Sequence, residues 1–334
     1  MIQSNYSELL QSIRGSVSEG LERVHEIMTS IGTNAPGSLS KYIGELVNRR
    51  GKRMRATFVL LLSSFAKEDQ TERGAMVSSS IELLHLATLV HDDIIDESDM
   101  RRNGLTAHRK WGTHTAVLVG DFALSKALEL IINEQDRRIP SCISRSASLL
   151  CEGEMLEIDR AGQSDITLDK YFEIIYGKTA SLWEACGECG GLVAGFEDDM
   201  VRNCAHLGKE MGMAFQIIDD VLDYGYGAGN LGKETQNDLS NGLVTLPLIL
   251  FFNSSTPEEK QKVHQLLDAV NTHNDEKSLK EVTTILNEKG CFSEARNMAL
   301  ERLSSCERAV RKLPESSFTD KLAEFCNILG SRKA

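Results

Sequence analysis

One residue pattern occurs twice in this chain, at widely separated positions: Asp-Asp-apolar-apolar-Asp stands at 92–96 and again at 219–223. On an α-helix the first and last Asp of each copy lie four residues apart and project from one face. Carboxylates held side by side repel one another without a counterion, and Mg²⁺, a hard cation, is bound by oxygen ligands that it shares with substrate phosphates. The pattern therefore predicts a fold in which two distant helices converge on one Mg²⁺-bridged diphosphate.

A solvated acidic helix face is the alternative for either copy alone. Both copies, however, stand in strongly apolar segments, at 81–95 and 211–222. Burying carboxylates is costly unless they are paired or coordinate a metal. The surroundings therefore favour a functional site over a solvated surface.

The rest of the chain predicts an all-α fold. Only five prolines occur in 334 residues, and apolar residues between them recur mostly at helical spacing. Because the two motifs share a ligand, we expect one large domain spanning 1–334. The expected helices cover 4–31, 56–65, 71–97, 117–133, 144–158 and 199–224, with two helices in 168–195 that meet near 177–179 and several more in 257–331.

Composition limits the partners and the compartment. The net charge of −12 argues against a nucleic-acid partner, which needs clustered positive charge. No apolar stretch reaches the length of about 20 residues that spans a bilayer, and no signal-peptide pattern opens the chain, so we expect a soluble, cytoplasmic protein. The eight scattered cysteines are expected to be reduced thiols, and Cys186 and Cys189 to be small core residues on a helix.

Basic residues near the motifs are candidates to bind phosphate. Arg101 and Arg102 follow the first motif, and two adjacent arginines can point to opposite sides and serve two diphosphates. Lys52 and Arg55, three positions apart at the expected start of a helix, are predicted to share a face and bind a second anion.

Two histidines and a glycine-rich loop complete the candidates. His85 and His91, nearly two helical turns apart, are expected to face the same cavity, although a satisfied core residue is the usual role of a lone His. The loop at 224–232 imitates a dinucleotide fingerprint and a P-loop, but both need a preceding strand where a helix is predicted here. A flap that carries Lys233 toward a phosphate is the better interpretation.

At this point the sequence resembles the trans-isoprenyl diphosphate synthases. The resemblance is carried by five segments in family order: 51–55, 92–102, 178–180, 215–223 and 232–247. It implies helices around a deep central cavity, a homodimer, and head-to-tail condensation of isopentenyl diphosphate with an allylic diphosphate. One departure is Leu243, where the family often has Lys.

The resemblance also implies a role for each matching residue. Asp92, Asp96 and Asp219 would bind several Mg²⁺ ions, supported by Asp93, Asp220 and Asp223. The allylic diphosphate would be held by Arg101, Lys178, Thr179, Gln216 and Lys233, and isopentenyl diphosphate by Lys52, Arg55, His85 and Arg102. Of these, Asp92, Asp93, Asp96, Arg101, Lys178 and Asp219 would act directly in catalysis.

Product length is expected to depend on the residues one turn before the first motif. Short-chain members commonly close the tunnel there with an aromatic residue, whereas Ala87 and Thr88 are small. The next floor would be Leu84, Ile81 or a residue of the facing helix at 144–158. We therefore expect a long, octaprenyl-like product, with geranylgeranyl or farnesyl diphosphate synthase as the alternative.

Other classes of protein remain open. They are a non-catalytic partner subunit of a heteromeric synthase, a terpene cyclase, and a phosphohydrolase suggested by His91-Asp92. Only the synthase explains both acidic motifs together with the Lys52, Arg55 and His85 site.

Overall fold

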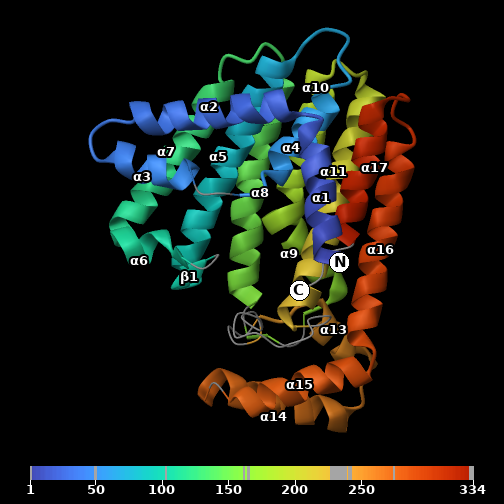
Figure 1. Cartoon of the computed structure of the whole chain (residues 1–334). Coiled ribbons are helices and arrows are strands. Elements are labelled where there is room, and N and C mark those ends of the chain that lie inside the picture. The colour runs from blue at the N-terminus through green and yellow to red at the C-terminus, as the bar shows by residue number, and fades with distance from the viewer. Residues whose placement is uncertain are drawn as a thin grey trace.

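The computed structural model describes residues 2–48, 51–101, 104–160, 162–163, 166–225, 239, 243–273 and 275–330. Nearly all of the regular structure in these ranges is helical, which confirms the all-α prediction (Figure 1). The elements are α1 (Ile2–Gly15), α2 (Ser18–Asn34), α3 (Leu39–Val47), α4 (Met54–Ser63), α5 (Thr71–Ile95), β1 (Met100–Arg101), β2 (Gly104–Leu105), α6 (Ala107–Trp111), α7 (Thr113–Ile131), α8 (Arg138–Arg160), α9 (Leu168–Ile175), the π-helical turn η1 (Tyr176–Ala180), α10 (Ser181–Val193), α11 (Asp198–Asp223), α13 (Leu246–Ser254), α14 (Pro257–His273), α15 (Glu276–Glu288), α16 (Cys291–Val310) and α17 (Ser317–Gly330).

The structure differs from the expected helices in a few places. The segment 4–31 is broken between α1 and α2, where the Ser16 hydroxyl donates to the Ile13 carbonyl over 2.6 Å and closes the end of α1. Helix α8 begins earlier than predicted, because Pro140 stands in its first turn, where no backbone N–H is needed. A two-stranded antiparallel ribbon, β1 with β2, follows the first motif and was not expected.

Helices α4, α5, α8, α10, α11 and α16 run along the long dimension of the molecule, whereas α14 and α15 lie across its lower end (Figure 1). The C-terminal ends of α5, α8 and α11 all point toward that lower end, which brings the two acidic motifs to the same side of the fold. The direction of these three helices is therefore what places the candidate site.

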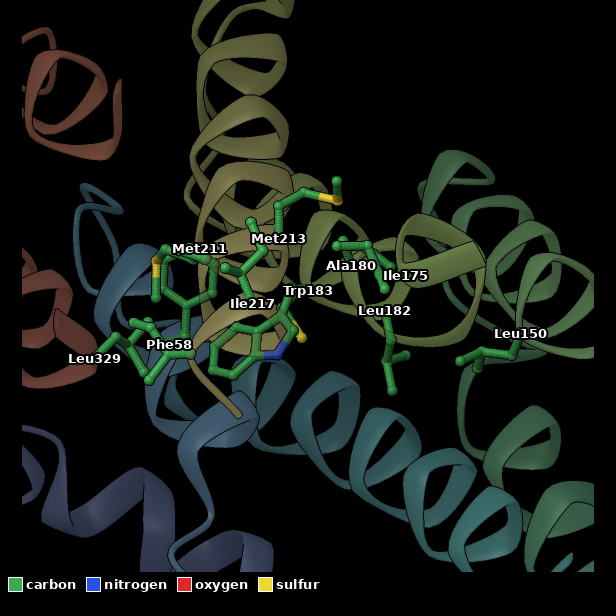
Figure 2. Packing of buried hydrophobic residues seen from close by; sticks show 14 of the residues in the cluster. Phe58, Leu150, Ile175, Ala180, Leu182, Trp183, Met211, Met213, Ile217 and Leu329 are labelled. Carbon is green, nitrogen blue, oxygen red and sulfur yellow. The ribbon is translucent and has the colours of Figure 1, made fainter. Parts of the chain in front are cut away.

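Aromatic side chains at the centre of the core join α4, α10, α11 and α17. The fully buried Trp183 lies 6.0 Å from Phe58 and 6.3 Å from Phe325, measured between ring centroids. Figure 2 shows Met211 and Ile217 of α11 packed beside these rings, with Leu329 of α17 next to Phe58. Each large aromatic side chain of this kind buries more apolar surface than an aliphatic one and so adds strongly to the stability of the core.

Helices α10 and α11 pack closely because each has glycines on the side that faces the other. A Cβ atom on Gly212 would lie 2.6 Å from the Cα of Ala180, and one on Gly208 would overlap the Trp183 carbonyl oxygen. Gly187 meets the Cys204 carbonyl in the same way from the other helix. These contacts fix the position of the second motif on α11 relative to η1.

In the described part of the chain, no helix combines the length and hydropathy needed to cross a membrane. All eight cysteines are free thiols, and Cys186 and Cys189 are both buried in α10.

Candidate active site

The first motif ends α5. Asp96 caps the helix, and its backbone N–H donates to the Asp92 carbonyl over 2.8 Å, so both side chains keep the helical spacing predicted for them. Asp93 points elsewhere: it is buried, and its Oδ1 accepts from the Nε of Arg101 in β1 over 2.5 Å. The ribbon therefore folds Arg101 back onto the motif.

The surroundings of Asp92 disfavour its negative charge. Burial, aided by the negative charge of Glu154, raises the pKa of the Asp92 carboxyl to about 7. The charge of Asp96 acts in the same direction, and that of Lys178 opposes it. A carboxylate in such surroundings is stabilised by an added cation.

The second motif lies on the last turns of α11. Asp220 is buried, and both its oxygens accept hydrogen bonds, from the Tyr171 hydroxyl over 2.6 Å and from the Gln216 amide over 2.8 Å. The Gln216 carbonyl in turn accepts from the Thr179 hydroxyl over 2.7 Å. Burial raises the pKa of Asp220 to about 7, although the Tyr171 hydrogen bond opposes this. Asp219 is less buried than Asp220, and Asp223 is the last residue of the helix.

Lys178 lies between the two motifs, on η1. Its Nζ pairs with Glu157 and lies 3.1 Å from Oε2 of Glu154, both on α8. Burial alone would lower the pKa of the Lys178 ammonium, but the carboxylates of Glu157 and Glu154 outweigh it and raise that pKa. π-helical turns are rare and occur frequently at functional sites.

Two glycines permit this arrangement. A Cβ on Gly177 of η1 would lie 2.7 Å from the Cα of Gly153 on α8, and a Cβ on Gly153 would overlap the backbone nitrogen of Lys178. Because the two backbones touch there, Glu154 and Glu157 on the adjoining turn of α8 reach the Lys178 side chain. Real Cβ atoms would force the elements apart.

The acidic cluster on α8 connects the motifs. The charge of Lys178 acts on Asp92, and that of Glu157 raises the pKa of Asp220. Both motifs therefore interact electrostatically with one group of side chains, made of Glu154, Glu157 and Lys178.

The basic segment differs from the prediction in one respect. Helix α4 begins only at Met54, so Lys52 precedes it and does not share a helical face with Arg55. The break is at Arg53, which adopts a left-handed φ of 49°. Lys52 is exposed, and its Nζ donates to the Tyr6 hydroxyl over 3.2 Å. The Arg55 guanidinium lies 5.2 Å from the ring centroid of Trp183.

Arg53 and Glu82 anchor this segment. The Arg53 guanidinium lies 3.1 Å from Oε2 of the buried Glu82, and Oε1 of Glu82 accepts from the backbone N–H of Ala56 over 3.1 Å. Glu82 thus caps the start of α4 from a neighbouring helix. One α5 turn later stands His85, so the same helix supports the basic segment and carries a candidate ligand.

The ring of His91 faces α7, and helical geometry argues against the expectation that His85 shares a cavity with it. The Nε2 of His91 lies 3.5 Å from Oδ1 of Asp121 on α7, and a Cβ on Gly120 would overlap the imidazole. Six residues on an α-helix correspond to a rotation of about 240°, at 3.6 residues per turn, so the two rings leave α5 in different directions.

The candidate chain-length residues lie on α5 before the first motif. Ala87 and Leu84 are buried, and Thr88 is partly buried, with its hydroxyl donating to the His85 carbonyl over 2.9 Å. Arg102 and Lys233 lie outside the described residues.

The donor set suits Mg²⁺. Asp92, Asp96 and Asp219 offer oxygen donors, and the partly buried Asp92 has more negative than positive charge acting on it. Among the described residues, no three His, Cys, Asp or Glu side chains already stand as a metal site. Phosphate oxygens and waters would complete the coordination, as is usual for Mg²⁺.

Sequence reasoning assigned no role to four residues that the structure joins to these groups. They are Glu82, Glu154, Glu157 and Tyr171. The only available signal was the acidic end of α8, where Glu154 and Glu157 follow Gly153 within one helical turn.

Known proteins resemble this chain over most of its length. Octaprenyl diphosphate synthase of Escherichia coli K12 is 33% identical over 287 residues, which cover 86% of this chain and 88% of that protein. The crystal structure of heptaprenyl diphosphate synthase from Staphylococcus aureus superimposes with a TM-score of 0.87 at 33% identity, covering 95% of this chain and 99% of that one. That of geranylgeranyl pyrophosphate synthetase from Pyrococcus horikoshii gives the same TM-score, 0.87, at 29% identity, over 98% of this chain and 100% of that one.

The family model described as polyprenyl synthetase matches residues 36–286. This range contains both acidic motifs, the basic segment, η1 and the acidic end of α8. The chain belongs to the polyprenyl synthetase family of prenyltransferases.

Proposed function

We propose that this enzyme condenses isopentenyl diphosphate with an allylic diphosphate, head to tail, to give an all-trans polyprenyl diphosphate in a Mg²⁺-dependent reaction. The observation that carries the proposal is the meeting of two acidic motifs around Lys178, Glu154 and Glu157. We assign residues 1–334 to one domain, since the two motifs come from distant parts of the chain.

In this proposal the acids have two kinds of role. Asp92, Asp96 and Asp219 would hold Mg²⁺, with Asp223 at the end of the same face of α11 as Asp219. Asp93 and Asp220 support them, because Asp93 is paired with Arg101 and Asp220 accepts two protein hydrogen bonds.

The cationic and polar groups divide between two substrates. Arg101, Lys178, Thr179, Gln216 and Lys233 are assigned to the allylic diphosphate, and Lys52, Arg55, His85 and Arg102 to isopentenyl diphosphate. Lys178 is well placed for this role because its paired carboxylates keep it charged. Substrate oxygens would take over part of those ion pairs.

The chemistry breaks one bond and forms another. The allylic C–O bond breaks, the alkene carbon of isopentenyl diphosphate forms the new C–C bond, and a proton then leaves to pyrophosphate. Bound Mg²⁺ would stabilise the negative charge on the leaving pyrophosphate. Lys178 and Arg101 hold the same group by charge-assisted hydrogen bonds, and no protein nucleophile is needed.

For product length we propose a long, octaprenyl-like chain. Ala87 is a small residue on the buried side of α5, about one turn before Asp92, and leaves room where a larger side chain would close the path. The named relatives include both long-chain and geranylgeranyl synthases, and geranylgeranyl diphosphate stays the competing product.

We further propose a homodimer that forms through α7. Leu118 is 64% exposed, and Ile132, just after the helix, is 61% exposed. Val117 and Leu128 of the same helix are exposed as well. An apolar row of this kind is typical of a protein interface. Eight free thiols are consistent with a reducing compartment, and we propose the cytoplasm.

The decisive test is incubation of the purified protein with Mg²⁺, labelled isopentenyl diphosphate and, separately, dimethylallyl, geranyl, farnesyl and geranylgeranyl diphosphates. We expect products longer than geranylgeranyl, and no turnover after Asp92→Ala or Asp219→Ala. Products no longer than geranylgeranyl would keep the reaction but refute the length. Absence of condensation with every primer would refute the proposed function and favour a partner subunit or a cyclase.

A further inference from the structure

The hydroxyl of Tyr171 begins a chain of hydrogen bonds that crosses three elements. Tyr171 on α9 is 3% exposed, and its hydroxyl donates to Oδ2 of Asp220 on α11 over 2.6 Å. Oδ1 of Asp220 accepts from the Gln216 amide, and the Gln216 carbonyl accepts from the Thr179 hydroxyl on η1. Asp220 belongs to the second motif, Gln216 precedes that motif by less than one helical turn, and Thr179 belongs to the Lys178-Thr179 turn.

The direction of every bond in this chain follows from chemistry. Oδ1 of Asp220 accepts a hydrogen bond here, so the NH₂ group of Gln216, which can only donate, faces Asp220 and its carbonyl oxygen faces Thr179. The Thr179 hydroxyl can then only donate to Gln216. The orientations of the Gln216 amide and of the Thr179 hydroxyl thus both depend on the Asp220 carboxylate.

Asp220 differs from its neighbour in the motif. Its two oxygens are both occupied by protein donors and the side chain is buried, whereas Asp219 is only partly buried. A buried carboxylate that loses one of its two donors has an oxygen with neither a protein partner nor water, which is costly in free energy. Tyr171 is therefore what holds Asp220 in this geometry.

We propose that Tyr171 is a positioning residue that, through Asp220, sets Gln216 and Thr179 in the orientation that receives the allylic diphosphate. The inference rests on the proposed function, which assigns Gln216 and Thr179 to that substrate. Without the Tyr171 hydroxyl, Oδ2 of Asp220 loses its donor, so the carboxylate is less firmly held and the Gln216 amide that donates to it is held less firmly as well. Ordering a site during binding lowers affinity.

The variant that isolates the hydroxyl is Tyr171→Phe. It keeps the ring and its contact with Phe172, whose centroid lies 5.4 Å away. A matched control is Tyr176→Phe, because the Tyr176 hydroxyl also donates to a carboxylate, Oε2 of Glu184, over 2.8 Å. That carboxylate belongs to α10 and has no part in the acidic motifs.

Two readouts are needed. The first is the Kd for an unreactive thio analogue of farnesyl diphosphate, measured by calorimetry with Mg²⁺. The second is the KM for each substrate in the condensation assay. We expect Tyr171→Phe to raise the Kd for the analogue and the KM for the allylic substrate about tenfold, which corresponds to about 1.4 kcal/mol. The KM for isopentenyl diphosphate should stay within about twofold of the wild-type value, as should all the constants of Tyr176→Phe.

A double-mutant cycle with Asp220→Asn tests the route and also serves if one single variant folds poorly. If Tyr171 acts through Asp220, adding Tyr171→Phe to Asp220→Asn causes little further loss, so the two effects are non-additive. Unchanged allylic affinity, additive effects, or a lower Tm with unaltered KM values would overturn the positioning role. A wild-type protein that neither binds the analogue nor turns over would instead overturn the proposed function, and this inference with it.

Discussion

Replacing Asp92 with Asn should stabilise the metal-free protein while it abolishes turnover. The Asp92 carboxyl is partly buried near Glu154, and its pKa is raised from 3.8 to about 7. At about 1.4 kcal/mol per pH unit, this rise corresponds to as much as about 4 kcal/mol by which the ionised side chain destabilises the fold. Asn has nearly the same shape and no charge.

The sign of the pH dependence follows from proton binding. Between pH 3.8 and about 7 the folded protein holds the Asp92 proton and the unfolded chain does not, so the stability of the wild type falls as pH rises through this window. Below this window Asp92 is protonated in both the folded and the unfolded protein, so Asp92→Asn is no more stable than the wild type. Above the window the difference in free energy of unfolding between the two proteins is constant and at its largest.

The assay is urea unfolding of wild type and Asp92→Asn at pH values from 4 to 8, in EDTA and then in Mg²⁺ with inorganic pyrophosphate. We expect the gap in free energy of unfolding to open between about pH 4 and 7 in EDTA and to close or reverse with ligands, because only the wild type gains Mg²⁺. Asp96→Asn, on the exposed end of the same helix, is the control with a smaller gain. Equal stability of Asp92→Asn and wild type at pH 8 in EDTA would refute the reasoning.

Three further variants test other parts of the site. Gly153→Ala should cost about 1–3 kcal/mol in urea unfolding and reduce kcat, because its Cβ would overlap the Lys178 backbone, whereas Gly15→Ala, with open space around it, should change neither; equal effects would contradict the close packing. Glu82→Gln should raise the KM for isopentenyl diphosphate about tenfold and leave the allylic KM unaltered, since it weakens the anchor of the basic segment, and a change in both constants would argue against a local effect. Ala87→Phe should shorten the product to geranylgeranyl or less, seen by chain-length analysis, and an unaltered product would show that the growing chain passes elsewhere.

The acidic motifs were predictable because their spacing has meaning on any helix. The same holds for the meeting of two helices near Lys178 and Thr179, where the structure has η1 between α9 and α10. Family membership is likewise confirmed by the match over residues 36–286.

The residues that sequence reasoning missed owe their roles to tertiary contacts. Glu154 reaches Lys178 only because α8 touches η1 at Gly153, and Tyr171 matters only because α9 turns its hydroxyl toward Asp220. Lys52 was misplaced on a helix because nothing local indicates that Arg53 adopts a left-handed conformation and pairs with Glu82. Contacts between distant segments leave no periodic signal.

The π-helical turn has a consequence for how this wall of the site tolerates change in length. A turn with i→i+5 hydrogen bonds contains more residues than an α-helical turn, so α9 and α10 form one rod whose two halves are out of phase. Deleting one residue within 176–180 would restore the common phase and rotate α9 by about 100° relative to α10. Tyr171 of α9 would then turn away from Asp220, while Trp183 of α10 stayed in the core. The extra residue in this turn therefore keeps α9 facing Asp220 and α10 facing the core at the same time.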